Sequence, residues 1–190
     1  MNIGVIGLGL IGGSFALAAK KHFVDAVLFG GDKNINHIKE AIKKDIIEFE
    51  LETDDLVKME VLILAIPVDA ASGLVLDLLD KMNDNALLFD VGSTKSSICK
   101  TVALHPKRNQ FLATHPIAGT EFSGPLAAFS DLYVNKTQIL CESQKTRSDL
   151  LEWAIQFFRF MNMNIQEMNP QEHDQHIAYV SHISHISSFM

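Results

Sequence analysis

The stretch GLGLIG at residues 7–12 decides the fold of this chain. Its glycines follow a G-x-G-x-x-G pattern, directly after a short apolar run at residues 3–6 and at the start of a helix-like stretch from about Ile11 to His22. In such a pattern the first glycine permits a tight turn, the second lets the backbone approach a pyrophosphate, and the third lets helix and strand pack closely. The helix N-terminus also offers free N–H groups to phosphates. Together these features predict a dinucleotide-binding turn.

An acidic residue stands where such a turn needs one. Asp32 lies 20 residues after Gly12 and follows a second apolar run at residues 26–29. A carboxylate there accepts hydrogen bonds from the adenosine ribose and repels a 2′-phosphate, which favours NAD over NADP. The neighbouring Lys33 works against that preference, and Gly30-Gly31, expected in a flexible loop, loosens it further. The alternative is a glycine-rich turn of some other α/β protein, with Asp32 as a solvated turn residue.

Short apolar runs and helix-like stretches alternate along the rest of the chain. Strands are predicted at residues 61–66, 87–89, 111–113, 137–141 and 163–168. Helices are predicted at about 35–44, 69–82 and 147–161. This order implies βαβ units, and therefore an α/β, Rossmann-type domain whose mostly parallel sheet is covered on both faces. We assign residues 1–168 to this NAD-binding domain and residues 169–190 to the first helix of an all-helical domain.

The composition narrows the class of protein. Of the 190 residues, 47% are apolar and 21% charged, which is typical of a globular domain and excludes a disordered chain. No window approaches the about 18 uninterrupted apolar residues of a membrane span, and no targeting segment is visible, so we expect a cytoplasmic protein. The net charge of −7 argues against nucleic-acid binding. Cys99 and Cys141 are too few for a disulfide framework, which fits a reducing compartment, and we expect both side chains to be buried.

Three predicted strands end in residues suited to a site, because ligands of open α/β sheets bind beyond the carboxyl ends of the strands. Ala65-Ile66-Pro67 offers an uncharged wall for a nicotinamide ring, or is an ordinary strand stop. Residues 90–95 (DVGSTK) place hydroxyls and an amine where a polar substrate would lie, while Ser93 or Thr94 is alternatively a helix cap. His115, expected in a loop, is suited to acid–base chemistry near neutral pH, or is a surface histidine.

Residues 170–190 form one long predicted helix. A helical wheel gives it a narrow stripe of small and polar residues, namely Asp174, Ala178, Ser181, His185 and Ser188. His185 therefore projects from a face whose small neighbours leave room for a ligand. Tyr179 lies on the opposite side, which we take as the core face.

Four histidines fall within 13 positions of this helix, at residues 173, 176, 182 and 185. A metal site must be considered, but the i, i+4 pair of a zinc-binding helix is absent and no cysteine is near. We therefore expect no metal. His173 and His176 are interpreted as exposed or helix-capping residues.

These motifs together resemble the prephenate dehydrogenase family, which includes the arogenate dehydrogenases. The resemblance runs in order along almost the whole chain: GLGLIGGS at 7–14, Asp32, AIP at 65–67, DVGSTK at 90–95, HPIAGTE at 115–121 and HDQHIAYVSHISH at 173–185. The glycine pattern is shared with many enzymes, whereas the last two motifs are much more specific. The chain is identified as the N-terminal part of a member of this family.

The resemblance implies an NAD-dependent oxidative decarboxylation of prephenate to 4-hydroxyphenylpyruvate, on the route to tyrosine. It implies that neutral His115 accepts a hydrogen bond from the ring hydroxyl, that Ser93 helps to orient both, and that Glu121 gates the site. It also implies a homodimer formed through a helical C-terminal domain, with feedback by tyrosine common in the family. The implied substrate-binding residues are Thr120, Glu121, Ser181 and His185. The residues expected to bind the cofactor are Gly7, Leu8, Gly9, Leu10, Ile11, Gly12, Asp32, Lys33, Ala65, Ile66, Pro67 and Ser93.

One departure from the family bears on activity. The family's helical domain supplies an arginine that binds a substrate carboxylate, and no arginine follows Arg159 here. We therefore expect this chain to be the front part of a longer protein, with weakened substrate binding or no activity of its own. The alternatives are arogenate as substrate, an NAD-binding module without catalysis, and a related β-hydroxyacid dehydrogenase, whose expected lysine base is missing.

Overall fold

An eight-stranded, mostly parallel sheet forms the centre of the protein. The computed structural model describes residues 1–187, with side chains as far as Tyr179. The strands are β1 (Asn2–Ile6), β2 (Val27–Gly31), β3 (Phe49–Glu50), β4 (Val61–Leu64), β5 (Leu87–Asp90), β6 (Phe111–Ile117), β7 (Thr137–Cys141) and β8 (Asn164–Met168). They lie in the order β3-β2-β1-β4-β5-β6-β7-β8, and every neighbouring pair is parallel except β6 and β7. The predicted α/β fold is confirmed.

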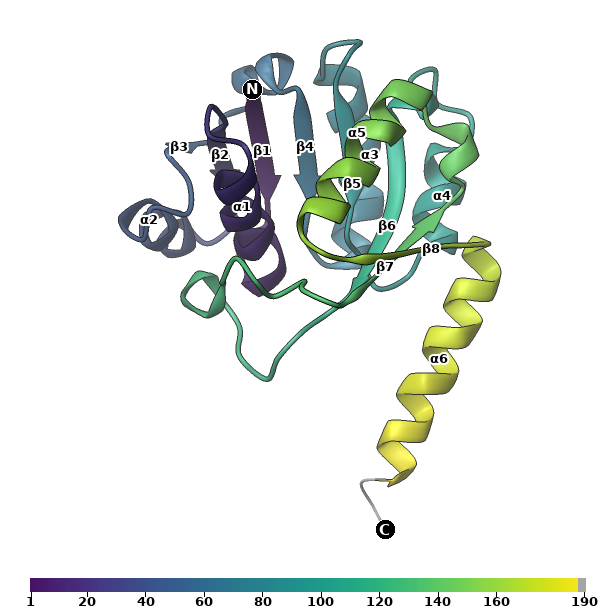
Figure 1. The fold of residues 1–190 in the computed structure, drawn as a ribbon. Coiled ribbons are helices and arrows are strands. Elements are labelled where there is room, and N and C mark those ends of the chain that lie inside the picture. The colour runs from purple at the N-terminus through teal and green to yellow at the C-terminus, as the bar shows by residue number, and fades with distance from the viewer. Residues whose placement is uncertain (188–190) are drawn as a thin grey trace.

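Helices cover both faces of the sheet (Figure 1). They are α1 (Leu10–His22), α2 (Ile35–Lys43), α3 (Val68–Lys81), α4 (Ser96–Val102), α5 (Ser148–Phe160) and α6 (Pro170–Ser187), with short 3-10 turns η1 (Thr53–Lys58), η2 (Arg108–Gln110), η3 (Pro125–Ala127) and η4 (Ser143–Lys145). Helices α1, α2 and α5 pack on one face, around Phe15 and Phe157, and α3 and α4 pack on the other, around Val75 and Val102. Strand β4 reads VLIL and is buried throughout, because both of its faces are covered.

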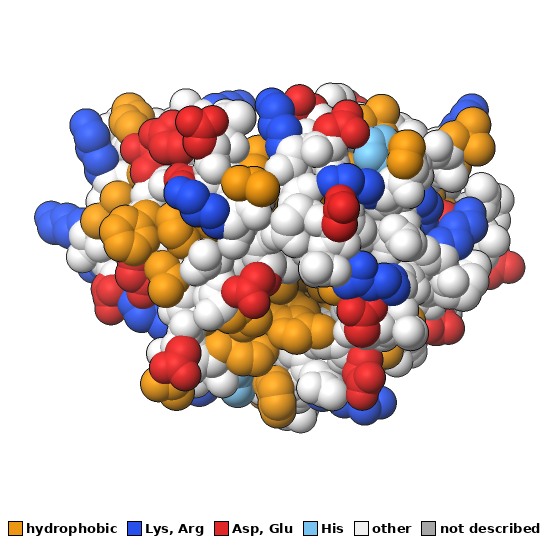
Figure 2. Space-filling view, turned by 90° about the horizontal axis from the view of Figure 1, so that it is seen from above, with side chains coloured by type: hydrophobic (Ala, Val, Ile, Leu, Met, Phe, Trp, Pro, Cys, Tyr) orange, Lys and Arg blue, Asp and Glu red, His pale blue; other side chains and the backbone are white. Residues whose placement is uncertain are grey.

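The carboxyl ends of the parallel strands meet along one edge of the sheet. Ile6 in β1, Leu64 in β4, Asp90 in β5 and Ala113 in β6 pair in one row across it. Residues that follow this row, including the glycine turn, therefore stand at the edge where ligands of open α/β sheets bind. Figure 2 looks onto the opposite end of the molecule, where positive and negative side chains are interspersed over the visible face.

Strand β6 is longer than the apolar run predicts. It continues through His115 and Pro116 to Ile117, because β7 pairs with it in the antiparallel direction and places Ile139 opposite His115. The expectation of a loop at His115 is therefore wrong. A strand holds this histidine more rigidly than a loop would.

The connection from β6 to β7 folds back over the start of α1. The Tyr133 hydroxyl donates a hydrogen bond to the carbonyl oxygen of Ile11 at 2.6 Å, and the backbone N–H of Phe129 donates to the Ser14 hydroxyl at 3.1 Å. A Cβ at Gly13 would lie 2.8 Å from the Ala128 side chain, so α1 and this connection are in close contact. The connection that carries residues 118–124 is thus anchored to the helix of the glycine turn.

The Gly30-Gly31 pair belongs to strand β2 and not to a flexible loop, so the expected flexibility near the adenosine is wrong. Gly30 pairs with Val5 in β1, and Gly31 pairs with Ile6. A Cβ at Gly30 would lie 2.8 Å from the side chains of both Ile47 and Leu8. Close packing, not mobility, accounts for a glycine at this position.

Helix α6 leaves the body of the domain after its first turn and projects past the side on which β1 and β4 end (Figure 1). Tyr179 on this helix is 71% exposed, so the interpretation of its face as a core face is wrong for the described part of the chain. The helix has no layer of the sheet beneath it at that point. Through residue 187, no helix is both long enough and apolar enough to cross a bilayer.

Candidate functional site

The glycine turn has the three features that its pattern predicts. Gly7 has φ of +98°, and a Cβ there would lie 2.2 Å from the carbonyl oxygen of Ala65. A Cβ at Gly12 would lie 1.9 Å from the carbonyl oxygen of Gly7, so only glycine allows the helix to pack this closely. A Cβ at Gly9 would meet no heavy atom within 4 Å, so this position faces open space. The second glycine is thus the one that leaves room for a ligand against the backbone.

The N-terminus of α1 is open at this turn. Its N-cap is Gly9, no side chain caps it, and no acidic residue lies in its first turn. The first N–H groups of a helix have no partner within the helix and carry a positive partial charge. The turn therefore presents a site for an anionic group, next to the space in front of Gly9.

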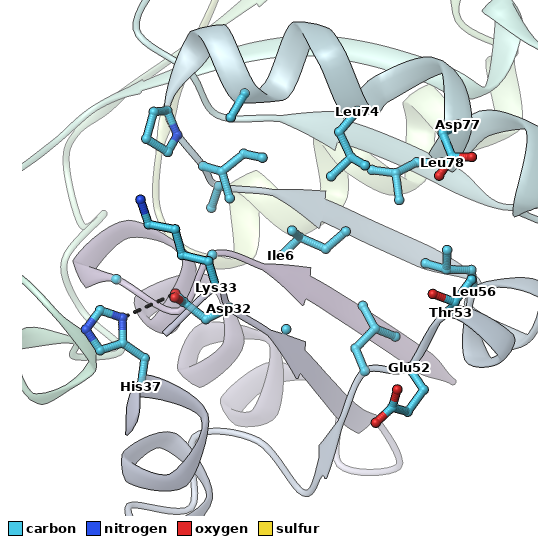
Figure 3. A pocket seen from close by; sticks show the side chains of 18 of the residues that line it. Ile6, Asp32, Lys33, His37, Glu52, Thr53, Leu56, Leu74, Asp77 and Leu78 are labelled. Carbon is cyan, nitrogen blue, oxygen red and sulfur yellow. Dashed lines mark ion pairs between the residues drawn. The ribbon is translucent and has the colours of Figure 1, made fainter. Parts of the chain in front are cut away.

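Asp32 is held as a carboxylate at the end of β2. Its two oxygens accept hydrogen bonds from the backbone N–H groups of Leu8 and Asn34, each at 2.8 Å. The imidazole Nδ1 of His37 lies 3.3 Å from the carboxylate (Figure 3). Partial burial opposes ionisation, but these hydrogen bonds and His37 hold the pKa of Asp32 below its usual value. The carboxylate is therefore charged at neutral pH and available to accept hydroxyl hydrogen bonds.

A cleft of about 590 Å³ extends from the glycine turn between η1 and α3. The predicted cofactor residues that line it are Gly7, Gly9, Asp32, Lys33, Ala65, Ile66 and Pro67. The side chains of Leu8 and Leu10 are buried in the core instead, so these two residues can offer a ligand only backbone groups.

The apolar wall of this cleft was not predicted from the sequence. It contains the side chains of Leu56, from η1, and of Leu74 and Leu78, from α3 (Figure 3). Leu51, just before η1, also lines the cleft. Leu74 and Leu78 have the spacing of a core-facing helix, and η1 carries no periodic pattern. His37 was also missed, although its position five residues after Asp32, in the first turn of α2, is a signal that could have found it.

A second cluster surrounds His115 at the same edge of the sheet. Nδ1 of His115 lies 2.9 Å from Nε2 of His173, and Nδ1 of His173 lies 2.8 Å from Oδ1 of Asp174. His173 is fully buried, so its interpretation as an exposed or capping residue is wrong. His176 is exposed, in agreement with the prediction. The buried position of His173 follows from the docking of the first turn of α6 beside β6 and α4, which no local pattern reveals.

Asp174 caps helix α4 from a distant part of the chain. Its carboxylate accepts the backbone N–H of Lys95 at 2.7 Å and that of Ser96 at 2.9 Å. The predicted caps, Ser93 and Thr94, do not act as such, because the N-cap residue of α4 is Lys95, without a side-chain cap of its own. A carboxylate 78 residues further along the chain replaces the local hydroxyl.

Lys95 is fully buried and does not face a substrate, contrary to the expectation for residues 90–95. Its ammonium donates to the Asp90 carboxylate and, at 2.6 Å, to the carbonyl oxygen of Thr114. The Thr114 hydroxyl donates to the Asp90 carbonyl oxygen at 2.6 Å. These contacts join the ends of β5 and β6 and fix the backbone immediately before His115.

The ring of His115 is neutral over the physiological range. Burial, followed by the charges of His173 and Lys95, lowers its pKa to about 4, against the opposing charge of Asp174. A neutral imidazole has one N–H and one lone pair, so it can accept a proton or a hydrogen bond. The expected neutral state is thus supported by the environment of the ring.

In the described part of the chain, none of the remaining predicted substrate residues is hydrogen-bonded to His115 or to another of them. Ser93 is exposed in the turn between β5 and α4, and Thr120 and Glu121 are exposed beyond β6. The Thr120 hydroxyl accepts the backbone N–H of Phe122 at 3.2 Å. The side chains of Ser181 and His185 lie outside the described residues.

Neither the cysteines nor a metal cluster offers another chemistry in the described residues. Cys99 and Cys141 are buried and unpaired with each other, and burial raises the pKa of each thiol to about 12. The thiolate that a nucleophile needs is therefore disfavoured. Within the described residues, no three histidine, cysteine, aspartate or glutamate side chains are arranged so that they could hold one metal ion.

Comparison with known proteins gives consistent matches. The model of the family "Prephenate dehydrogenase, nucleotide-binding domain" matches residues 15–167. Prephenate dehydrogenase of Bacillus subtilis (strain 168) is 34% identical over 172 residues, covering 88% of this chain and 46% of that protein. Arogenate dehydrogenase of Synechocystis superposes with a TM-score of 0.86 at 26% identity, covering 96% of this chain and 64% of that one.

A further solved structure is prephenate dehydrogenase from A. aeolicus in complex with hydroxyphenyl propionate and NAD+. It superposes with a TM-score of 0.85 at 25% identity, covering 100% of this chain and 67% of that one. The chain spans about half the length of the curated relatives it matches, with shares of 46%, 60% and 43%.

Proposed function

Because the chain belongs to the prephenate dehydrogenase family, of which it carries the nucleotide-binding domain, we propose that it takes part in the NAD-dependent oxidative decarboxylation of prephenate to 4-hydroxyphenylpyruvate. The observation that carries this proposal is His115. It is a neutral imidazole at the strand edge that also bears the glycine turn, and Nδ1 is its only ring nitrogen engaged by a described residue.

The cleft fits NAD on three grounds. Gly9 leaves open space against the backbone where a pyrophosphate would approach, and the uncapped N-terminus of α1 favours its negative charge. The charged Asp32 is suited to accept both ribose hydroxyls and to repel a 2′-phosphate. The leucine wall between η1 and α3 suits the flat apolar faces of an adenine. We propose Ile66 and Pro67, on the same cleft, as the wall towards the nicotinamide.

For this reaction the protein needs to position the substrate and NAD and to supply one proton acceptor. Bound NAD supplies a hydride acceptor for the ring carbon that bears the hydroxyl. His115 accepts the hydrogen bond of that hydroxyl, and holds its proton as the carbon becomes a carbonyl. Loss of carbon dioxide leaves an electron pair that makes the ring aromatic, and the proton returns from His115 to the ring oxygen. No net proton is consumed, and aromatisation drives the loss of the carboxylate.

The direct test mixes the purified 190-residue chain with NAD and prephenate and follows the appearance of NADH. We expect NADH only when both are present. His115→Asn should lower turnover by roughly 100-fold, the size of a typical acid–base contribution, while the Kd of NAD stays within about twofold. Undiminished turnover in this variant would contradict the role of His115. NAD binding without any NADH would favour the alternative of a nucleotide-binding module that needs further chain for catalysis.

Arogenate is a second candidate substrate, because the structure of Synechocystis arogenate dehydrogenase superposes as closely as that of a prephenate dehydrogenase. The two substrates differ only in a keto or an amino group on the side chain. Competition between them in the same NADH assay decides the preference. A kcat/KM that is higher for arogenate would replace prephenate in the proposal.

We further propose that residues 1–168 are the nucleotide-binding domain and that α6 begins a helical domain that contributes substrate contacts, including Ser181 and His185, and a dimer interface. The projecting α6 and the share of the relatives that this chain covers support this division. Thr120, Glu121 and Ser93 are proposed as the contributions of the nucleotide-binding domain to the same substrate site. Sedimentation tests the dimer, by comparing the mass of this chain with that of a chimera extended by the C-terminal part of a relative. The NADH assay with added tyrosine tests feedback.

A further inference from the structure

We propose that the buried His173 and the half-buried Asp174 form a positioning element that fixes which nitrogen of His115 carries the proton. The relay runs from the Asp174 carboxylate through the ring of His173 to Nδ1 of His115, with contacts of 2.8 Å and 2.9 Å. It leaves Nε2 of His115 as a lone-pair acceptor. The role in catalysis rests on the proposed function, whereas the proton arrangement itself does not.

The direction of the relay starts at Asp174, whose ionised carboxylate has no proton to donate and can only accept hydrogen bonds. Partial burial opposes ionisation, but hydrogen bonds from Ser96, His173 and the Lys95 backbone lower the pKa of Asp174 to about 2. Its Oδ1 already accepts the Lys95 N–H at 2.7 Å. The facing nitrogen of His173, Nδ1, must therefore carry a proton, because two acceptors would repel at 2.8 Å.

The proton on Nδ1 of His173 decides the state of its other nitrogen. In a neutral ring, Nε2 of His173 is then an acceptor, and the nitrogen at 2.9 Å from it must donate. That nitrogen is Nδ1 of His115. The two rings meet edge to face, at an interplanar angle of 75°, so an N–H in the plane of one ring can point at the other.

The consequence for His115 is a single tautomer, Nδ1–H with a bare Nε2. Nε2 has no hydrogen-bond partner among the described residues, and unlike the unpartnered buried atoms it is not fully shielded from solvent. It therefore remains accessible to a ligand. A hydroxyl of the proposed substrate needs an acceptor, and the opposite tautomer would present an N–H instead. The Asp174 carboxylate thus orients the His173 ring directly and, through His173, the ring of His115.

Full protonation of His173 would reverse the relay. Both of its nitrogens would then donate, and Nδ1 of His115 would become the acceptor. The charged and titratable groups that act on His115 are His173, Lys95 and Asp174, and Lys95 is itself paired with Asp90. The measurement therefore belongs at about pH 8, where an ordinary histidine is neutral.

The test is a long-range proton–nitrogen correlation spectrum of the chain labelled with ¹⁵N at histidine, with His115 assigned by the loss of its signals in His115→Asn. At about pH 8 we expect His115 as a neutral ring with a protonated Nδ1 and a bare Nε2. A protonated Nε2 on His115, with or without a cationic His173, overturns the proposal. Because the spectrum needs no substrate, its result does not depend on whether the proposed function is correct.

Three variants separate positioning from mere structure. His173→Leu removes the acceptor, and His115 should move to the Nε2–H form that predominates in a free histidine side chain. His173→Gln places an amide oxygen near the former Nε2 and should keep the Nδ1–H form. His176→Gln, at an exposed position on the same helix, is the matched control and should change nothing. Persistence of the Nδ1–H form in His173→Leu would show that His173 does not set it.

Where the chain turns over prephenate, the same variants predict a rate effect. His173→Leu should lower kcat by roughly 100-fold with the Kd of NAD within about twofold, and His173→Gln should restore at least about tenfold of that loss. Equal losses in both variants would indicate a structural role and contradict positioning. A chain that binds NAD and shows the predicted tautomer without turnover would favour the nucleotide-binding module and leave the relay standing.

Discussion

Gly9 and Gly12, the second and third glycines of the turn, should fail in opposite ways when each is changed to alanine. A Cβ at Gly12 would lie 1.9 Å from the Gly7 carbonyl oxygen and 3.0 Å from side chains of Val5 and Ala65, so helix and strand must separate by about 1 Å. Overpacking of this size against backbone costs about 3 kcal/mol, a large part of the about 5–15 kcal/mol that holds such a domain folded. Gly12→Ala is therefore expected to lower the urea midpoint strongly.

Gly9→Ala should fold and fail to bind. A Cβ there meets nothing within 4 Å, and its φ of −78° is allowed for alanine, so the free energy of unfolding should change by less than about 1 kcal/mol. The added methyl instead fills the space for the pyrophosphate. The Kd of NAD should rise at least about tenfold, or about 1.4 kcal/mol.

Urea denaturation and calorimetric titration with NAD, on both variants and the parent chain, check these expectations. Gly9→Ala with parental NAD affinity would refute the placement of the pyrophosphate against Gly9. Gly12→Ala with parental stability would refute the close packing of α1 on the turn.

Four further predictions concern Asp32, His115 and Lys95. Asp32→Ala should raise the Kd of NAD roughly tenfold, because it removes hydrogen bonds to a charged acceptor, each of about 1.5–3 kcal/mol. It should also narrow the preference for NAD over NADP, because it removes the repulsion of a 2′-phosphate. Parallel titrations with both nucleotides measure the two effects. As long as His173 stays neutral, turnover should hold from neutrality down to about pH 5 and fall as His115 protonates near its pKa of about 4, in contrast to an ordinary histidine, and a pH profile of kcat/KM tests it. Because its pKa is depressed from 6.5, His115 also contributes stability that is complete above pH 6.5 and is lost as the pH falls to about 4, which urea midpoints across that window report. Lys95→Met should destabilise the fold by about 3–5 kcal/mol, since Asp90 would remain buried without its partner, and urea denaturation shows whether it does.

Local patterns were sufficient for most of the fold. Buried parallel strands are short apolar runs and their crossover helices are periodic, so β1, β4 and β5 were predicted to within two residues of their ends. The strand extension through His115 was missed, because it depends on pairing with β7, more than 20 residues further along the chain. The two-residue β3 and the turn η1 carry no periodic signal at all.

The site divides in the same way between local and long-range causes. The glycine turn and Asp32 are specified locally, since the φ of Gly7 and the contacts of Gly12 are properties of a single turn and its adjoining strands. The roles of Lys95 and His173 were misjudged, because a lysine and a histidine usually lie at the surface unless partners pair with them. Those partners, Asp90 and Asp174, are visible only when β5, α4 and α6 are in place.

By itself the sequence determined the α/β architecture, the glycine turn with Asp32, and the family, because each depends on residues close together in the chain or on motifs in a set order. Tertiary structure alone decided the state of His115. Its rigid place on β6 comes from an antiparallel neighbour, its low pKa from burial beside Lys95, and its tautomer from a carboxylate on α6. Proton positions follow the hydrogen bonds that surround a ring, and here those bonds join segments that lie 58 residues apart in the chain.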